Sequence, residues 1–299
     1  MNIMNLKVWI EAIRPRTLPV SAASVIMASA VATINFQFEW LPTLLCLAFA
    51  ILAQIVSNLA NEYYDFLRGT DKQGRVGPRR GVTEGDIEPN TLRNVTFATL
   101  ALTCVVGCSL IPFGGWWLIP AGIIILLASL AYSTGPYPLS YHGLGEITVF
   151  LFYGVVPVNL SYYIMTGVFD AWALLASFCI GFMGVNVLLV NNYRDCADDE
   201  EAGKRTAVVM FGKAAAQAAY LINGYAAIGI MAMFWLYLLG NGWTWHIIPP
   251  IVYLIMHTAC WQKLRSREGA ALNPLLGSTA RAMLSFTILF FIFTIYPSH

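Results

Sequence analysis

Charged residues are scarce in this chain of 299 residues. Only 11% of them are Asp, Glu, Lys or Arg, whereas about 25% is usual in a soluble domain. Hydrophobic residues make up 58%, and the mean hydropathy is +0.65. A soluble protein of this size could not cover its surface with so few charges, and a disordered chain is far less apolar. The composition therefore indicates an integral membrane protein.

Paired cysteines and an excess of charge are also missing. The six cysteines include no CxxC pair, so we exclude a disulfide scaffold and expect small, buried apolar side chains. The net charge is only +1, which gives no attraction to a polyanion. We therefore expect a lipid bilayer around the protein and no nucleic-acid partner. The oligomeric state is not readable from the sequence.

Long apolar runs fill most of the chain. A membrane-spanning helix needs about 20 mostly apolar residues, and turn residues separate nine runs of this kind. We expect an all-α, polytopic bundle of nine transmembrane helices that forms a single domain, residues 1–299. The expected spans are residues 18–36, 40–63, 92–111, 116–133, 145–166, 171–192, 214–240, 244–262 and 279–297.

The basic residues support this count. With nine spans, all 17 Lys and Arg residues fall on one side, in the N-terminal segment or after the second, sixth and eighth spans. The positive-inside rule then predicts a cytoplasmic N-terminus and an external C-terminus in the cytoplasmic (inner) cell membrane. Of the acidic residues, only Glu39 and Asp170 lie on the opposite side. The cytoplasmic face is therefore the expected position of a functional site.

Two clusters of polar residues end spans on that face. At the end of the second span, Asn58, Asn61, Glu62 and Asp65 have the spacing i, i+3, i+4 and i+7, and Asp71 follows. These four share one helix face.

The sixth span ends in a similar way, and there Asn192, Asp195 and Asp199 share a face. The similar placement of the two clusters, four spans apart, indicates an internal repeat. Its two halves are expected to bring the carboxylates together.

Carboxylates on one face repel each other unless a cation lies between them. Oxygen ligands without His or Cys suit Mg²⁺, which commonly bridges protein carboxylates and substrate phosphates. Basic residues adjoin both clusters, as expected of a diphosphate pocket. The alternative is a pair of solvated, salt-bridged helix ends. The candidate diphosphate-binding residues are Asn58, Arg68, Lys72, Arg79, Arg80, Lys204 and Arg205.

A diphosphate site at the surface of an apolar bundle suits a lipid diphosphate. Metal and basic side chains stabilise the leaving diphosphate, and aromatic side chains can shelter an allylic cation. A transporter is the alternative of a different class. The charges lie at one face rather than at midplane, which favours surface chemistry over alternating access.

Several motifs give the chain a resemblance to the UbiA superfamily of intramembrane aromatic prenyltransferases. The Asn61-x-x-x-Asp65 and Asp195-x-x-x-Asp199 motifs are similar to the paired aspartate-rich motifs of that superfamily. The chain also resembles the branch of this superfamily that prenylates 1,4-dihydroxy-2-naphthoate. The stretches that carry this resemblance are Arg14-Pro-Arg-Thr17, Arg68-Gly-Thr-Asp71, Tyr132-Ser-Thr-Gly135, Asn191-Asn-Tyr-Arg-Asp195 and Gly203-Lys204-Arg205-Thr206. The family usually has Asp where this chain has Glu62.

The resemblance implies roles for individual residues. Asn61, Asp65 and Asp71 are expected to hold one Mg²⁺, and Asp195 and Asp199 a second. Lys204 and one of Arg79 or Arg80 are expected to clamp the diphosphate. Arg14 is expected to face the acceptor's carboxylate or, alternatively, to anchor the chain at the membrane interface. Tyr132 is expected to line the path of the allylic cation or, alternatively, to serve packing alone. Glu62 and Asn192 complete the candidate metal ligands, and Asp65, Asp195, Lys204, Arg14 and Tyr132 are the candidate catalytic residues.

The activity that the resemblance implies is prenyl transfer from a polyprenyl diphosphate to 1,4-dihydroxy-2-naphthoate. Loss of CO₂ gives demethylmenaquinone, a step in menaquinone biosynthesis. Other acceptors, such as 4-hydroxybenzoate, haem, a chlorin or a glycerol phosphate, are the alternatives within the class.

Overall fold

The computed structural model describes residues 3–71, 73–74, 76–242 and 244–295, and these contain helices and no strand. Short turns join the helices: η1 (Leu139–Tyr141), the π-helical turn η2 (Phe150–Val155), η3 (Thr244–Ile247) and η4 (Gly269–Leu272). The helices are α1 (Ile3–Ile13), α2 (Leu18–Ile34), α3 (Trp40–Leu67), α4 (Pro89–Cys108), α5 (Ile111–Gly114), α6 (Leu118–Ala131), α7 (Gly145–Val149), α8 (Val156–Thr166), α9 (Ala171–Arg194), α10 (Cys196–Glu201), α11 (Ala207–Ile230), α12 (Ala232–Gly240), α13 (Ile248–Ser266) and α14 (Asn273–Ile295).

Local sequence signals explain several helix boundaries. Proline lies in the first turn of α2, α4 and α13, where its missing N–H costs no helical hydrogen bond. Gly167, with φ of +75°, ends α8. The side chain of Asp170 then caps α9 by accepting hydrogen bonds from the backbone amides of Trp172 and Ala173, as N-cap residues commonly do.

Within the described residues, helix fills most of each of the nine predicted spans, and the all-α membrane fold is confirmed. In the described part of the chain, six helical segments are long and apolar enough to cross a membrane. A seventh is added if α1 and α2, which meet at 55°, count as one span. Residues 118–131 of α6 are helical but shorter than a full span, and α13 is not among the six. The six segments are Trp40–Leu67, Pro89–Gly114, Gly145–Thr166, Ala171–Arg194, Ala207–Gly240 and Gly269–Ile295.

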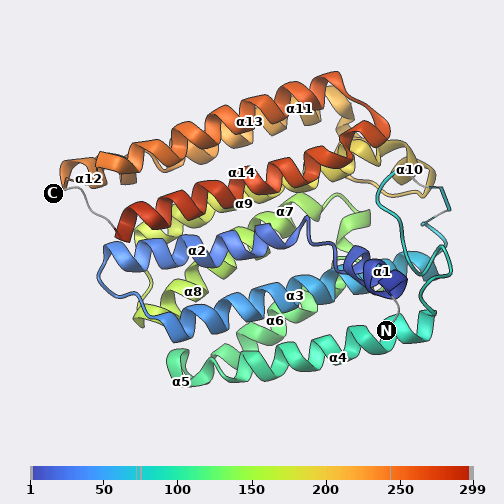
Figure 1. The fold of residues 1–299 in the computed structure, drawn as a ribbon, viewed down its shortest axis with the longest axis horizontal. Helices are drawn as coiled ribbons and strands as arrows, with labels where there is room; N and C mark the ends of the chain where they lie inside the picture. The colour runs from blue at the N-terminus through green and yellow to red at the C-terminus, as the bar shows by residue number, and fades with distance from the viewer. Residues whose placement is uncertain (1–2, 72, 75, 243, 296–299) are drawn as a thin grey trace.

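The long helices lie side by side along the length of the molecule (Figure 1). Helix α2 packs against α14, α9 and α8, α11 packs against α9, and α3 packs against α4. The α1 and α10 helices and the segment after α3 lie together at one end, on the right in Figure 1. The α5 and α12 helices lie at the opposite end. This arrangement brings the ends of α3 and α9, where the two polar clusters lie, to the same end of the bundle.

Small residues allow the central helices to approach closely. Ala23, Ala28 and Ala30 of α2 are fully buried in the main core. Where η2 meets α9, a Cβ added at Gly154 would lie 2.4 Å from the Gly181 Cα. Helix pairs in membranes depend on such close approach, because lipid supplies no hydrophobic drive for association.

Candidate active site

A cavity of about 450 Å³ runs from the end of the bundle that carries α1 and α10 into its apolar interior. Its deep part is lined by apolar side chains such as Leu118, Leu126 and Ile164. The predicted site residues that line its polar part are Arg14, Asn58, Asn61, Asp65, Arg80, Tyr132, Asn192, Asp195, Asp199 and Lys204. Most of the predicted site therefore comes together around one cavity, although its members are up to 190 residues apart.

The first cluster lies on the last turns of α3. Asn61 donates from Nδ2 to Asp65 Oδ2 at 3.2 Å and to Ser133 Oγ at 2.9 Å. The Asp65 residue is 2% exposed, and its Oδ1 accepts a hydrogen bond of 2.8 Å from the Tyr141 hydroxyl. The predicted shared face of Asn61 and Asp65 is therefore present.

Glu62 lies at the edge of this face away from Asn61, because one residue along a helix turns the side chain by about 100°. It is fully buried, and its Oε1 accepts a hydrogen bond of 3.2 Å from the Val82 backbone amide. Glu62 is not among the described residues that line the cavity. The structure thus directs Glu62 toward the segment after α3 instead of into the cavity.

The second cluster lies where α9 meets α10. Both oxygens of Asp195 accept hydrogen bonds of 2.7 Å from Arg194, one from Nε and one from Nη2. Arg194 also donates to Asn191 Oδ1 at 2.9 Å. Such a buried bidentate pair fixes the carboxylate plane. Arg194 had no predicted role, because adjacent residues on a regular helix point about 100° apart.

Lys204 connects the two clusters. Its Nζ lies 3.4 Å from Asp65 Oδ2 and 3.7 Å from Asp199 Oδ1. Burial opposes the charged form, but the carboxylates of Asp65 and Asp199 outweigh it and raise the pKa of Lys204. The side chain therefore carries a positive charge between two carboxylates. In this position its ammonium can also bind a diphosphate oxygen.

Tyr141, in η1, is a member of the site that the sequence did not predict. Its hydroxyl contacts Asp65 and lies 3.1 Å from Thr70 Oγ1, and Lys204 Nζ lies 4.8 Å from its ring centre. Burial and the Asp65 carboxylate raise the pKa of Tyr141, which keeps it a neutral hydrogen-bond donor. No local pattern singles out this tyrosine, because its partners come from α3 and from the segment after α10.

The two arginines considered for the diphosphate clamp, Arg79 and Arg80, have different environments. Arg80 is 7% exposed, lines the cavity and lies 3.1 Å from Asp71 through its Nε. Arg79 is exposed and pairs with Asp86. Of the two arginines considered for the diphosphate clamp, Arg80 is thus the one at the cavity.

Three further candidates lie outside the cavity lining or the described chain. Arg68 donates to the carbonyl oxygens of Ser133 and Gly135, and Arg205 is exposed. Lys72 lies outside the described residues.

Arg14 lies at the bend between α1 and α2, with a φ of +57° that is unusual for a non-glycine residue. Its guanidinium donates to Asn61 Oδ1 at 2.5 Å. Asn58 fixes the same bend, because its Nδ2 donates to the Ile13 carbonyl oxygen at 2.8 Å and to Thr17 Oγ1 at 3.2 Å. A strained residue held in this way is typical of a functional position.

Tyr132 and Asn192 also line the cavity. Tyr132 ends α6, and its hydroxyl would lie 3.6 Å from a Cβ added at Gly145. Asn192 donates to Glu146 Oε1 at 3.1 Å, so its amide is engaged by a neighbouring helix.

The donor set at this end of the cavity consists of carboxylate and amide oxygens. Within the described ranges, no group of three or more His, Cys, Asp or Glu side chains is close enough to hold a metal ion. The Asp65 and Asp199 carboxylates nevertheless flank the same cation, Lys204. A site of this kind fits Mg²⁺, which takes oxygen ligands and shares them with substrate phosphates.

The fold and the site define an integral membrane protein with a charged site at one end of an intramembrane cavity. The chain belongs to the UbiA prenyltransferase family, whose sequence profile matches residues 21–286. It is therefore an enzyme, a prenyltransferase, and its resemblance to this superfamily is confirmed.

Curated relatives match nearly the whole chain. It is 31% identical to the 1,4-dihydroxy-2-naphthoate octaprenyltransferase of Escherichia coli (strain K12), over 97% of this chain and 95% of that protein. It is 33% identical to the protein of the same name from Mycobacterium tuberculosis, over 92% of each chain.

Solved structures share the fold at low sequence identity. A UbiA homolog from Archaeoglobus fulgidus bound to DMAPP and Mg²⁺ has a TM-score of 0.63 and 17% identity, covering 95% of this chain and 99% of that one. The apo structure of a UbiA homolog from Aeropyrum pernix K1 has a TM-score of 0.67 and 12% identity, with 93% and 96% covered.

Proposed function

We propose that this enzyme transfers a polyprenyl chain from its diphosphate to 1,4-dihydroxy-2-naphthoate, with loss of CO₂ and release of diphosphate, and forms demethylmenaquinone in its reduced, quinol form. The observation that carries the proposal is the position of Lys204 between Asp65 and Asp199, at the charged end of an otherwise apolar cavity. Such a cavity suits a substrate with an anionic head and a long apolar chain. The names of the relatives support the naphthoate as acceptor.

In this proposal, Lys204 and Arg80 bind the diphosphate and orient it at the cavity entrance. Tyr141 donates a hydrogen bond to Asp65 and holds that carboxylate in place. Arg14 faces the acceptor's carboxylate, and Tyr132 lines the path of the allylic group. The apolar lining excludes water from the cation that forms as the C–O bond breaks.

Mg²⁺ is the proposed cofactor. Asn61, Asp65 and Asp71 are the proposed ligands of one ion, and Asp195 and Asp199 those of a second. When bound, the metal neutralises charge on the leaving diphosphate. The oxygen donor set supports this assignment, as does the Mg²⁺ that is bound in the structural neighbour from Archaeoglobus fulgidus.

We also propose how the chain is oriented. Its 299 residues form one domain in the cytoplasmic (inner) cell membrane, with the N-terminus and the site on the cytoplasmic side and the C-terminus outside. The one-sided distribution of Lys and Arg supports this orientation, together with the positions of α1 and of the last turn of α14 at opposite ends of the bundle (Figure 1).

The test is prenyl transfer by the purified protein in detergent. Farnesyl or geranylgeranyl diphosphate and Mg²⁺ are supplied with 1,4-dihydroxy-2-naphthoate or with 4-hydroxybenzoate, and products are identified by mass spectrometry. We expect a prenylated naphthoquinol that has lost one CO₂, and no product with EDTA. Product from 4-hydroxybenzoate alone would reassign the acceptor, whereas failure to bind any diphosphate would favour a transporter.

A further inference from the structure

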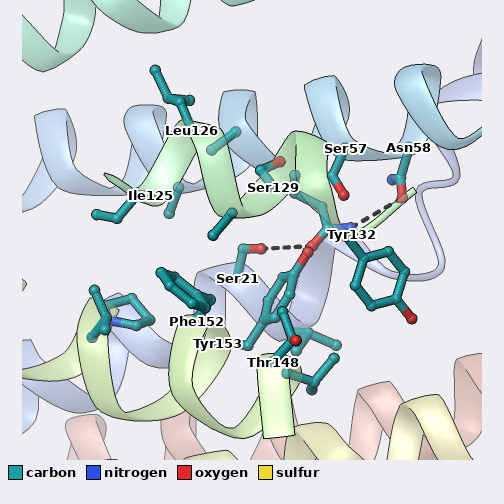
Figure 2. Close-up of a pocket in the computed structure, with 18 of the residues that line it drawn as sticks. Ser21, Ser57, Asn58, Ile125, Leu126, Ser129, Tyr132, Thr148, Phe152 and Tyr153 are labelled. Atoms are coloured by element: carbon teal, nitrogen blue, oxygen red, sulfur yellow. Dashed lines mark hydrogen bonds between the residues drawn. The ribbon is translucent and has the colours of Figure 1, made fainter. Parts of the chain in front are cut away.

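Polar side chains line the middle of the cavity, beyond the charged end. We call five of them the hydroxyl belt: Ser21, Gln54, Ser57, Ser129 and Tyr153. Figure 2 shows its serines and tyrosine around one part of the cavity, beside the apolar Ile125, Leu126 and Phe152. Helices α2, α3 and α6 and the turn η2 contribute its members. Polar groups at this depth are costly in a membrane protein and commonly mark a functional site.

Part of the belt is linked by hydrogen bonds. Ser21 Oγ donates to Gln54 Oε1 at 3.1 Å, and Gln54 Nε2 donates to Asn58 Oδ1 at 3.0 Å. The Tyr153 side chain lines the same part of the cavity (Figure 2). The links between α2 and α3 could serve helix packing alone, so they do not by themselves indicate a ligand.

Ser129 is not explained by helix packing. Its hydroxyl is buried and has no hydrogen-bond partner among the described residues, and the residue lines the cavity. Burial of a hydroxyl without a partner costs free energy. A polar group of a bound molecule would remove this cost.

The donor substrate cannot supply that group. Its isoprenoid chain has no hydrogen-bonding atoms, and its diphosphate is expected at Lys204. The belt therefore fits a second molecule that is mostly apolar and carries a hydroxyl. An aromatic acceptor with phenolic hydroxyls has this chemistry.

The spacing along α3 agrees with an aromatic acceptor. Asn61, which contacts Arg14, and Ser57 are four residues apart, which corresponds to about 6 Å along the helix. This is close to the span of one aromatic ring with its substituents. In 1,4-dihydroxy-2-naphthoate the 4-hydroxyl is meta to the carboxylate, so a carboxylate held near Arg14 would leave this hydroxyl within reach of Ser57.

We propose that the hydroxyl belt binds the 4-hydroxyl of the acceptor through Ser57, Ser129 and Tyr153, and selects 1,4-dihydroxy over 1-hydroxy aromatic acids. The 1-hydroxyl is adjacent to the carboxylate and can bond to it internally, so the 4-hydroxyl is the one that needs protein partners. This inference rests on the proposed function, because it assumes an acceptor with a carboxylate near Arg14.

The test compares two acceptors, 1,4-dihydroxy-2-naphthoate and 1-hydroxy-2-naphthoate, at saturating farnesyl diphosphate. The variants are Ser57→Ala, Ser129→Ala and Tyr153→Phe. The matched control is Ser177→Ala, a buried serine of α9 that bonds to the Leu174 carbonyl oxygen. The readouts are the ratio of kcat/KM for the two acceptors, the KM for farnesyl diphosphate, and direct binding of each acceptor to the protein.

The wild-type enzyme should prefer the dihydroxy acid by about 5-fold or more, as one net hydrogen bond allows. Each belt variant should bring this ratio toward one and leave the KM for farnesyl diphosphate within about 2-fold. Ser57→Thr, which keeps a hydroxyl, should preserve the preference. A purely structural role predicts equal losses on both acceptors instead.

Unchanged ratios in all three belt variants would overturn the belt assignment while leaving the proposed function intact. Equal losses on both acceptors with a raised KM for farnesyl diphosphate would do the same. If the wild-type enzyme binds and prenylates neither naphthoate, the proposed acceptor itself is wrong, and the assignment fails with it.

Discussion

The ammonium of Lys204 lies 3.4 Å from the Asp65 carboxylate, although 139 residues separate them in the chain. The same ammonium lies 3.7 Å from Asp199, so one cation serves carboxylates from both polar clusters. Without it, two buried negative charges would face each other across the cavity. Lys204 therefore contributes both to the packing of this end of the bundle and to the site.

Replacement of Lys204 tests this relationship. Lys204→Met should lower kcat/KM about 100-fold, because both the diphosphate contact and the balance of charge are lost. Lys204→Arg should retain part of the activity. Lys213→Met is the control, since Lys213 is exposed and stacks over Tyr193. If Lys204→Met kept more than half of the wild-type kcat/KM, Lys204 would not be a diphosphate ligand.

The stability that Lys204 provides should depend on pH. Its pKa is raised above the ordinary value of 10.5, so the charged form is favoured in the folded state. The stabilising contribution should be fully present below pH 10.5 and be lost as the pH rises through the higher folded-state pKa. Thermal unfolding of the wild-type protein and of Lys204→Met, in detergent from about pH 7 to about pH 11, should show a constant difference in Tm that shrinks only at the alkaline end. A difference that already disappears near about pH 8 would contradict this prediction.

Asp65 should be far more sensitive than an acidic residue outside the cavity. Asp65→Asn keeps the shape but removes the charge that faces Lys204, and we expect activity to fall by about 100-fold or more. The control is Asp86→Asn, because Asp86 pairs with the exposed Arg79 and should tolerate the change. Rates measured at several Mg²⁺ concentrations show whether the loss includes weaker metal dependence. Equal activity of the two variants would remove Asp65 from the site.

Hydropathy and helical spacing predicted the features that depend on one segment at a time. The nine apolar runs became helices, and the four-residue spacing of Asn61 and Asp65 put them on one face. The positive φ of Arg14 and the contacts of Tyr141 could not be predicted in this way. They depend on how α1, α3 and the segment before α7 meet, which no local pattern specifies.

The contact between Arg194 and Asp195 is another feature that local spacing could not predict. Adjacent residues on a regular helix point about 100° apart, so the sequence suggested no contact between them. The helix ends at Arg194, and Asp195 has non-helical backbone angles. This break lets the guanidinium reach both carboxylate oxygens.

Variants of Glu62 distinguish a positioning role of this residue from a metal-binding role. Its Oε1 accepts the Val82 amide hydrogen bond and thereby fixes the segment that carries Arg80. Glu62→Gln keeps an acceptor at this position and should change activity by less than about 3-fold, whereas Glu62→Ala should loosen the segment and raise the KM for the prenyl diphosphate. Neither variant should change the Mg²⁺ concentration that gives half-maximal rate, because the carboxylate is directed away from the cavity lining. Hydrogen exchange at residues 80–87 should quicken in Glu62→Ala only. A large rise in the Mg²⁺ requirement of Glu62→Gln would instead identify Glu62 as a metal ligand.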